Sequence, residues 1–186
     1  SVQMKKIFTL ILCLLFILPA ACLAQSTDPR IGIVRVDDGS LLNDNEISSI
    51  VEDKTDSLFE NDKYDYVSFG ELEADFGAFL DRNNIQNNNQ ITDDMLVKFA
   101  KEQNLDYLCF MNFNLDEMQY DRVFFKSSYR AMLGVDLKYY NIATGELLYA
   151  NHLFADGTAK DQTSACRNSA AKLMRRIGWR FDPDNL

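Results

Sequence analysis

Hydrophobic and polar positions in the first part of the chain alternate between strand and helix patterns. The β-branched run Arg30–Val36 is bounded by Asp37-Asp38-Gly39, which predicts a strand followed by a turn. Tyr64–Phe69 predicts a second short strand. Between the two, apolar residues recur at helical spacing: Ile47, Ile50, Val51 and Leu58. The candidate N-cap of this helix is Asn43 or Asn45, and the helix is expected to end at Asn61-Asp62.

The middle of the chain carries two further helix patterns around a polar tract. Residues 71–82 have a helical apolar stripe: Leu72, Phe76, Phe79 and Leu80. The amide-rich tract Asn83–Gln90 predicts a flexible surface loop within one domain, because neither side of it has enough strands to close a sheet. Thr92 is the expected N-cap of the next helix, with Asp93 and Asp94 in its first turn. Asn104 ends that helix, and the following strand is expected over Leu105–Phe113.

The last third of the chain has the clearest pattern. Apolar residues alternate with polar ones from Val123 to Tyr139, which predicts one long strand with a buried face. A turn at Asn141–Gly145 leads into a returning strand, Glu146–Phe154, which Asp156-Gly157 is expected to break. A final helix of about sixteen residues has an apolar stripe: Cys166, Ala170, Leu173, Met174 and Ile177. Arginines gather near its end: Arg175, Arg176 and Arg180. The order predicts a mixed α/β (α+β) domain of two or three layers with a long antiparallel hairpin.

A separate pattern precedes this domain. Lys5 and Lys6 are followed by an apolar run, Ile7–Leu18, and by small residues up to Ala24, which is typical of a bacterial export signal. The expected organisation is a signal peptide over residues 1–24, a short tether over 25–29 and a single domain over 30–182. The expected location is the periplasm or the exterior. Cys22 leaves the alternative of a membrane-anchored lipoprotein, although Pro19 stands where such signals usually have an aliphatic residue.

The remaining cysteines and the net charge narrow the function classes. Cys109 and Cys166 fit buried positions, and their oxidation state stays open. The chain has 19 Lys and Arg against 28 Asp and Glu, a net charge of −9, which becomes −11 without the two signal lysines. An acidic protein repels phosphate backbones, so no nucleic-acid partner is expected, and membrane association is expected only if Cys22 is lipidated.

Catalytic motifs are missing from the sequence. It has no nucleophile elbow, zinc-protease helix, phosphate loop or dinucleotide fingerprint, and no metal or cofactor is predicted. The one histidine, His152, lies in a predicted strand, where a structural role is the simpler interpretation. Asp37 and Asp38 follow a strand end, where α/β proteins often bind ligands, although a solvated turn is the simpler interpretation. Aromatic residues on or beside the long hairpin are candidate binding residues: Tyr120, Phe124 and Tyr140. Their alternative role is to fill the sheet as cross-strand pairs.

Two segments carry a resemblance to a known group. Asn104–Leu108 leads a helix into a strand, and Leu137–Tyr149 has the form of a strand, a Thr-Gly turn and a returning strand. This combination resembles bacterial envelope proteins, namely the curli secretion-channel lipoproteins (CsgG-like), the penicillin-binding-protein activator lipoproteins and the amino-terminal domain of TolB. The resemblance covers roughly residues 30–178 and implies an anticodon-binding-domain-like fold and a role in assembly or binding, with no catalytic residues.

The sequence therefore supports two functional hypotheses and leaves a purely structural domain as a third alternative. The first is a non-enzymatic exported envelope module that binds another envelope protein or associates with itself. The second is an exported hydrolase or small-ligand-binding protein that uses the acidic groups at Asp37 and Asp38.

Overall fold

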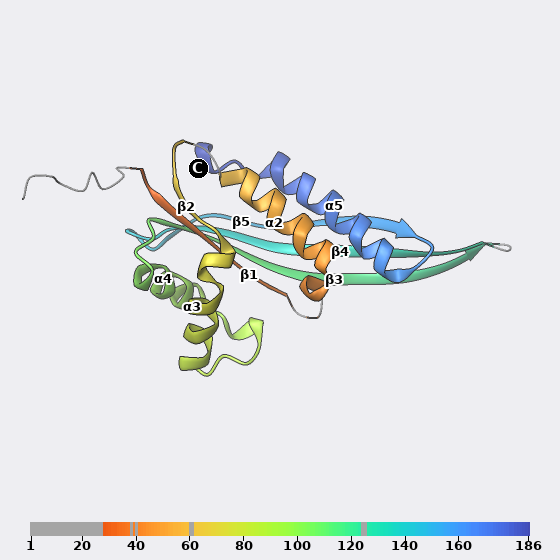
Figure 1. Ribbon diagram of the computed structural model, residues 1–186, viewed down its shortest axis with the longest axis horizontal. Helices are drawn as coiled ribbons and strands as arrows, with labels where there is room; N and C mark the ends of the chain where they lie inside the picture. The colour runs from red at the N-terminus through yellow and green to blue at the C-terminus, as the bar shows by residue number, and fades with distance from the viewer. Residues whose placement is uncertain (1–27, 38, 40, 60–61, 124–125) are drawn as a thin grey trace, which may run out of the picture.

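The computed structural model describes residues 28–186 except 38, 40, 60–61 and 124–125 (Figure 1). The predicted signal peptide, Cys22, Asp38 and Phe124 lie outside these residues. The described elements follow one another as β1 (Arg30–Asp37), η2 (Leu41–Asn43), α2 (Asn45–Phe59), β2 (Asp65–Val67), α3 (Phe69–Arg82), η3 (Asn88–Gln90), α4 (Asp93–Glu102), β3 (Tyr107–Val123), β4 (Lys126–Asn141), β5 (Glu146–Ala159), α5 (Gln162–Arg180) and η4 (Pro183–Asn185).

The strands form one mixed sheet in the order β2-β1-β3-β4-β5. β1 is parallel to both β2 and β3, whereas β3, β4 and β5 form an antiparallel meander. The register aligns Ile33 with Cys109 and Cys109 with Tyr139, so that apolar side chains of three strands share one face. This arrangement confirms the predicted α/β class with a mixed sheet and a long antiparallel hairpin.

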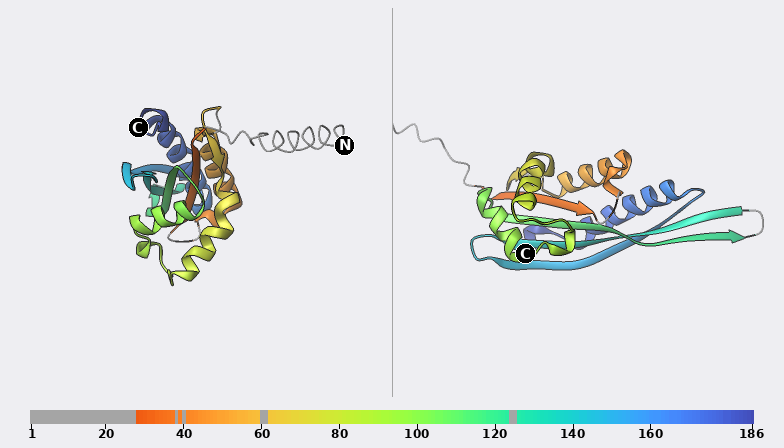
Figure 2. Two further views of the ribbon diagram at one scale, coloured as in Figure 1. Left: turned by 90° about the vertical axis from the view of Figure 1, so that its left-hand side faces the viewer. Right: turned by 90° about the horizontal axis from the view of Figure 1, so that it is seen from below.

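Helices cover the sheet unequally on its two faces. α2 and α5 lie together on one face, and α3 and α4 lie on the other (Figures 1 and 2). The core under α2 and α5 runs along β1, β3, β4 and β5, whereas the core under α3 and α4 is confined to β1, β2 and the adjoining ends of β3 and β4. The second face is therefore open over most of β4 and β5.

The β3–β4 hairpin is longer than the sequence pattern indicated. The strand expected over Leu105–Phe113 continues as far as Val123, and β4 begins only at Lys126. The prediction of one strand starting at Val123 was therefore wrong at its start, because the alternation of apolar and polar residues does not mark where one strand ends and the next begins. β5 pairs with β4 only from Tyr129 onward, and β1 pairs with β3 only as far as Phe113. The end of the hairpin thus projects as two strands (Figure 2).

The predicted break at Asp156-Gly157 was also wrong. β5 runs through both residues to Ala159, and Gly157 lies directly under α5. A Cβ at this position would lie 2.8 Å from the carbonyl carbon of Asn168 and closer still to the backbone of Ala165 and Ser169. Gly157 is needed here for close packing of helix on strand, which sequence alone does not distinguish from a turn.

The residues predicted to cap helices and to form turns were partly correct. Thr92 caps α4, with its hydroxyl oxygen accepting from the Met95 amide at 3.4 Å, and Gly145 has the positive φ of +72° expected in the hairpin turn. The start of α2 was assigned to the wrong residue, because the carboxylate of Asp44 accepts from the Glu46 and Ile47 amides in place of Asn43 or Asn45. The second strand ends at Val67, since Ser68 caps α3 and Phe69 opens it.

The amide tract is not a bare loop. Asn87 and Gln90 form a capping box around η3, and the side-chain amide of Asn88 donates to the carbonyl oxygen of Asp37. These contacts attach the tract to the end of β1.

Candidate functional site

The open face of the sheet carries a polar cluster. Asn112, Asp136 and His152 lie side by side on β3, β4 and β5, because the register pairs Asn112 with Asp136 and Asp136 with His152. Phe110 and Lys138 are the next pair on the same face, towards α4. Alternate residues of each strand point to opposite faces of the sheet. Since one set of residues is hydrophobic and buried under α2 and α5, the other set places these polar side chains on the open face.

His152 joins two carboxylates across the sheet. Its Nδ1 lies 2.8 Å from Asp136 Oδ1 on β4, and its Nε2 lies 3.3 Å from Asp116 Oδ2 on β3. Gly134 sits between them, and a Cβ there would lie 2.8 Å from the His152 ring and still closer to the Asp116 carboxylate. Asp116 reaches this position from a β-bulge between Leu115 and Glu117.

The electrostatics of this cluster favour a charged imidazole. The hydrogen bond with Asp136 is the largest effect and raises the pKa of His152 above its usual value; burial opposes this rise, and Asp116 adds to it. Both ring nitrogens are engaged by carboxylates, so neither faces a nucleophile or a substrate. The carboxylates bind opposite sides of the ring, and the described residues contain no group of three or more His, Cys, Asp or Glu that could hold a metal ion.

A shallow groove of about 400 Å³ adjoins the cluster, between η3 and the open face. Its polar lining comes from Asn88, Asn112, Asp136, Lys138, Asn151 and His152. The side-chain oxygen of Asn112 is buried without a hydrogen-bond partner in the described structure. At one end of the groove, Asp93 of α4 accepts hydrogen bonds from Lys138 at 2.6 Å and Tyr140 at 2.9 Å. The bond from Lys138 is the main reason that the pKa of Asp93 is lowered.

A second feature is the outer edge of β3. Since β1 ends opposite Phe113, no described strand pairs with this edge over residues 114–123. Leu115 and Tyr120 lie along it and are 43% and 54% exposed. Tyr120 packs on Tyr129 of β4, with ring centroids 4.9 Å apart. The edge thus combines unpaired backbone groups with two exposed large side chains.

The structure places the predicted site residues in different environments. Asp37 accepts a hydrogen bond from the Leu42 amide at 2.9 Å and lines a separate polar hollow with Gly39 and the amide tract. Tyr120 is exposed on the hairpin as expected. Tyr140 is only 1% exposed and its hydroxyl donates to Asp93, so it belongs to the core instead of a binding surface. Asp38, Phe124 and Cys22 lie outside the described residues.

Sequence reasoning missed the cluster around His152. Nothing in the sequence pattern indicated that Asp116 and Asp136 would flank this histidine. Cys109 and Cys166 are free thiols in buried positions, as their places in the strand and helix patterns suggested. In the described part of the chain no helix is both long and apolar enough to cross a membrane.

No protein-family model matches the chain, and no curated protein matches it in sequence. Among solved structures, lipoprotein GNA1162 from Neisseria meningitidis is similar with a TM-score of 0.46 and 10% identity, over 82% of this chain and 99% of that chain. The hypothetical protein CT253 from Chlamydia trachomatis is similar with a TM-score of 0.43 and 14% identity, over 83% and 95%. The LpoB C-terminal domain from Escherichia coli has a TM-score of 0.37 and 12% identity, over 73% and 87%. Structural similarities this weak identify neither a functional site nor an activity.

Proposed function

We propose that the protein is a non-enzymatic, exported envelope module that binds another envelope protein, or a second copy of itself, along the outer edge of β3. The observation that carries this proposal is the edge itself. Over residues 114–123, β4 pairs with one edge of β3, and the backbone N–H and C=O groups of every second residue point to the opposite edge, where no described strand pairs with them. Such an edge accepts an additional strand from a partner, and main-chain hydrogen bonds then supply the affinity.

Side chains along the edge add selectivity. Leu115 and Tyr120 are large and exposed, and the aromatic pair Tyr120–Tyr129 provides a rigid surface at little entropic cost. The bulge at Asp116 interrupts regular pairing near the body of the protein, so residues 117–123 are the most suitable segment for a partner strand.

The chemistry of the other candidate positions favours binding over hydrolysis. The carboxylate of Asp37 holds the turn after β1 through the Leu42 amide. The imidazole of His152 is occupied on both sides by Asp116 and Asp136. Neither arrangement offers an activated nucleophile next to a free general base.

Site-specific photo-crosslinking in producing cells tests the proposal. A photoreactive phenylalanine analogue at position 120 is expected to give a discrete adduct, either with another envelope protein or with a second copy. The matched control is position 179, since Trp179 is 81% exposed but lies on α5, away from the edge. Equal labelling from both positions, or no adduct from position 120 together with a monomeric profile in light scattering, contradicts the proposal.

The mature amino terminus is tested separately. We propose export with cleavage after Ala24 and release into the periplasm or medium, and mass spectrometry of the recovered protein measures the cut. A first residue of Gln25 supports this form, whereas a diacylglyceryl-modified Cys22 supports the membrane-anchored alternative.

A further inference from the structure

The groove on the open face of the sheet takes no part in the interaction proposed for the β3 edge. Its volume of about 400 Å³ lies within the range of roughly 300–1,000 Å³ that is typical of small-ligand sites. It crosses three strands at the level where Asn112 pairs with Asp136 and Asp136 pairs with His152. Its lining in the described structure includes no residue of the edge segment 114–123, so the two surfaces are separate.

The backbone beneath the groove is already paired. Over residues 107–113, β3 pairs with β1 on one side and with β4 on the other, and β4 in turn pairs with β5. A ligand here therefore meets side chains and not free N–H and C=O groups, which excludes the recognition of a peptide as an added strand. The groove favours a compact ligand that forms hydrogen bonds with side chains.

One side chain that lines the groove has an unused hydrogen-bonding atom. The side-chain oxygen of Asn112 is buried and accepts no hydrogen bond in the described structure. Since buried polar atoms are nearly always paired, this oxygen marks a position for a donor that comes from outside the chain. The side-chain oxygen of Asn114 is also buried without a partner among the described residues, but Asn114 does not line the groove. A ligand in the groove can therefore reach Asn112 and not Asn114.

The charged groups of the groove are paired within the chain and keep further hydrogen-bonding capacity. Asp136 is paired with His152. Lys138 is paired with Asp93 at 2.6 Å. A carboxylate has two oxygens and an ammonium group has three N–H donors, so neither Asp136 nor Lys138 is used up by its one partner. The groove thus offers acceptors at Asn112 and Asp136 beside a donor at Lys138.

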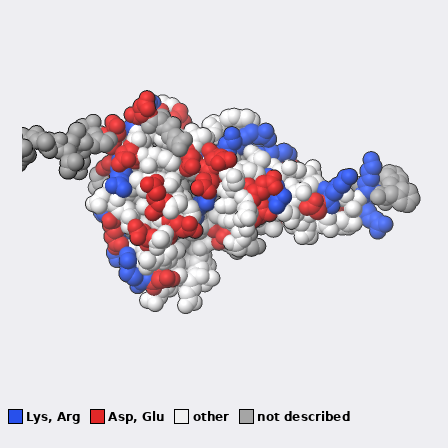
Figure 3. Space-filling view, viewed as in Figure 1, with Lys and Arg blue, Asp and Glu red and all other residues white. Residues whose placement is uncertain are grey.

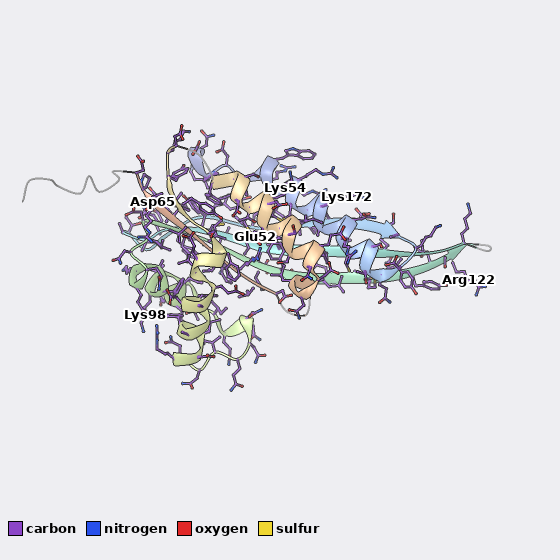
Figure 4. All side chains as sticks on the ribbon, in the orientation of Figure 1. Glu52, Lys54, Asp65, Lys98, Arg122 and Lys172 are labelled. Atoms are coloured by element: carbon purple, nitrogen blue, oxygen red, sulfur yellow. The ribbon has the colours of Figure 1, made fainter. Side chains whose placement is uncertain are left out.

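The surroundings of the groove disfavour a charged ligand. The chain has a net charge of −9, and acidic side chains are spread over the body of the molecule, so an anion is repelled (Figure 3). Lys54 and Lys172 do not offset this charge at the groove, because they lie on α2 and α5, which cover the other face of the sheet (Figure 4). A cation is disfavoured as well, because Lys138 lines the groove and Asp136 is already paired with His152.

We propose that the groove binds a neutral saccharide. A hydroxyl group both donates and accepts hydrogen bonds, so adjacent hydroxyls of one sugar ring match the acceptors Asn112 and Asp136 and the donor Lys138. The apolar side chains of Ile91 and Ala150 line the same groove and suit the C–H face of the ring. A few convergent polar groups beside apolar side chains are the usual composition of a small-ligand site.

Ligand-observed NMR with the full chain tests the proposal. Glucose, galactose and N-acetylglucosamine are the neutral probes, whereas glucuronate and glucosamine carry opposite charges on a similar ring. At least one neutral sugar is expected to bind, and to bind more tightly than glucuronate and glucosamine. Binding of none of the neutral sugars at millimolar concentration, or tighter binding of a charged one, overturns the proposal.

Replacement of Asn112 by leucine tests the contact with the unused oxygen. Asn112→Leu removes an acceptor that has no partner in the free protein, so the affinity for the sugar is expected to fall about 3–10-fold, equivalent to one neutral hydrogen bond, without a fall in Tm. Asn114→Leu makes the same change two residues along β3, and its affinity is expected to stay within about twofold of wild type. Equal losses in the two variants overturn the proposal.

A second variant fills the groove and leaves Asn112 in place. Ala150 is exposed on β5 and lines the groove, so the ring of Ala150→Phe occupies the position of the sugar and is expected to abolish binding. The control is Ala143→Phe, at an exposed position in the turn between β4 and β5, which is expected to bind the sugar as wild type does. Unchanged binding by Ala150→Phe, or loss of binding in both variants, overturns the proposal.

Discussion

Replacement of Gly157 by alanine tests the packing of α5 on the sheet. The added Cβ would lie 2.8 Å from the Asn168 carbonyl carbon, and ordinary contact begins at 3.4 Å, so α5 must move away from β5 by at least about 0.6 Å. The neighbouring atoms belong to helix backbone, which cannot rotate aside as a side chain can. A gap of 0.5–1 Å costs roughly a quarter to a half of the dispersion energy of each affected contact.

The buried stripe of α5 determines the size of the effect. Its residues pack on β4, β5 and α2: Ala165, Cys166, Ala170, Leu173, Met174 and Ile177. Overpacking at such an interface typically costs about 1–3 kcal/mol, against a gain of about 0.4–1 kcal/mol from the loss of glycine's freedom in the unfolded chain. We expect Gly157→Ala to lower the free energy of unfolding by about 1–2 kcal/mol. For a protein of this size, this lowers Tm by roughly 2–8 °C.

Urea denaturation provides the measurement, and Gly77→Ala provides the control. Gly77 lies within α3, and a Cβ added to it would have no neighbouring atom within 4 Å, so alanine there is expected to stabilise the protein by about 0.5–1 kcal/mol. The two variants make the same chemical change with opposite expected signs. If Gly157→Ala is as stable as wild type, the close approach of α5 to β5 is not a constraint and the reasoning is refuted.

Three further predictions concern polar groups. Ser169→Ala is expected to cost about 1–3 kcal/mol in urea denaturation, because the buried hydroxyl accepts from a β4 amide at 3.1 Å and donates to a β5 carbonyl at 2.7 Å, and its loss leaves both without that partner. Asp44→Ala is expected to lower Tm at pH 7, where the Arg167 hydrogen bond holds the pKa of the Asp44 carboxyl below its usual value; this stability is present above the unfolded pKa of about 4 and is lost as the pH falls through the folded pKa, so the Tm difference must shrink in acid. His152→Gln is expected to lower Tm more at pH 5.5 than at pH 9, because the raised pKa of His152 contributes stability that is complete below about pH 6.5 and is lost as the pH rises through the folded pKa; a Tm difference that does not depend on pH contradicts the interaction with Asp136.

Much of the fold was predictable because its signals are local. The stripe of α5 and the caps Thr92 and Gly145 depend on residues within a few positions of one another, and the structure confirms them. The failures at Val123 and Gly157 share one cause. Alternation of apolar and polar residues looks the same within one strand and across two strands joined by a turn. A glycine likewise looks the same in a turn and in a strand that passes beneath a helix. Only the residues packed against these positions distinguish the cases.

The candidate site was less predictable because it depends on register. Asp116, Asp136 and His152 are separated along the chain and come together only through the pairing of β3 with β4 and of β4 with β5. A shift of one residue in either ladder would move these side chains to the opposite face. The sequence identified His152 as a lone strand histidine, and it had no means of predicting both of its carboxylate partners.

The sequence by itself determined the α/β class, the helices with their buried stripes and the acidic charge of the chain, because these follow from composition and short-range periodicity. Only the tertiary structure decided which face of the sheet stays open and where β1 and β5 stop pairing with the β3–β4 hairpin. These properties arise from differences in strand length between neighbours. Such differences are set by pairing and packing over the whole sheet, and no single segment of the sequence contains that information.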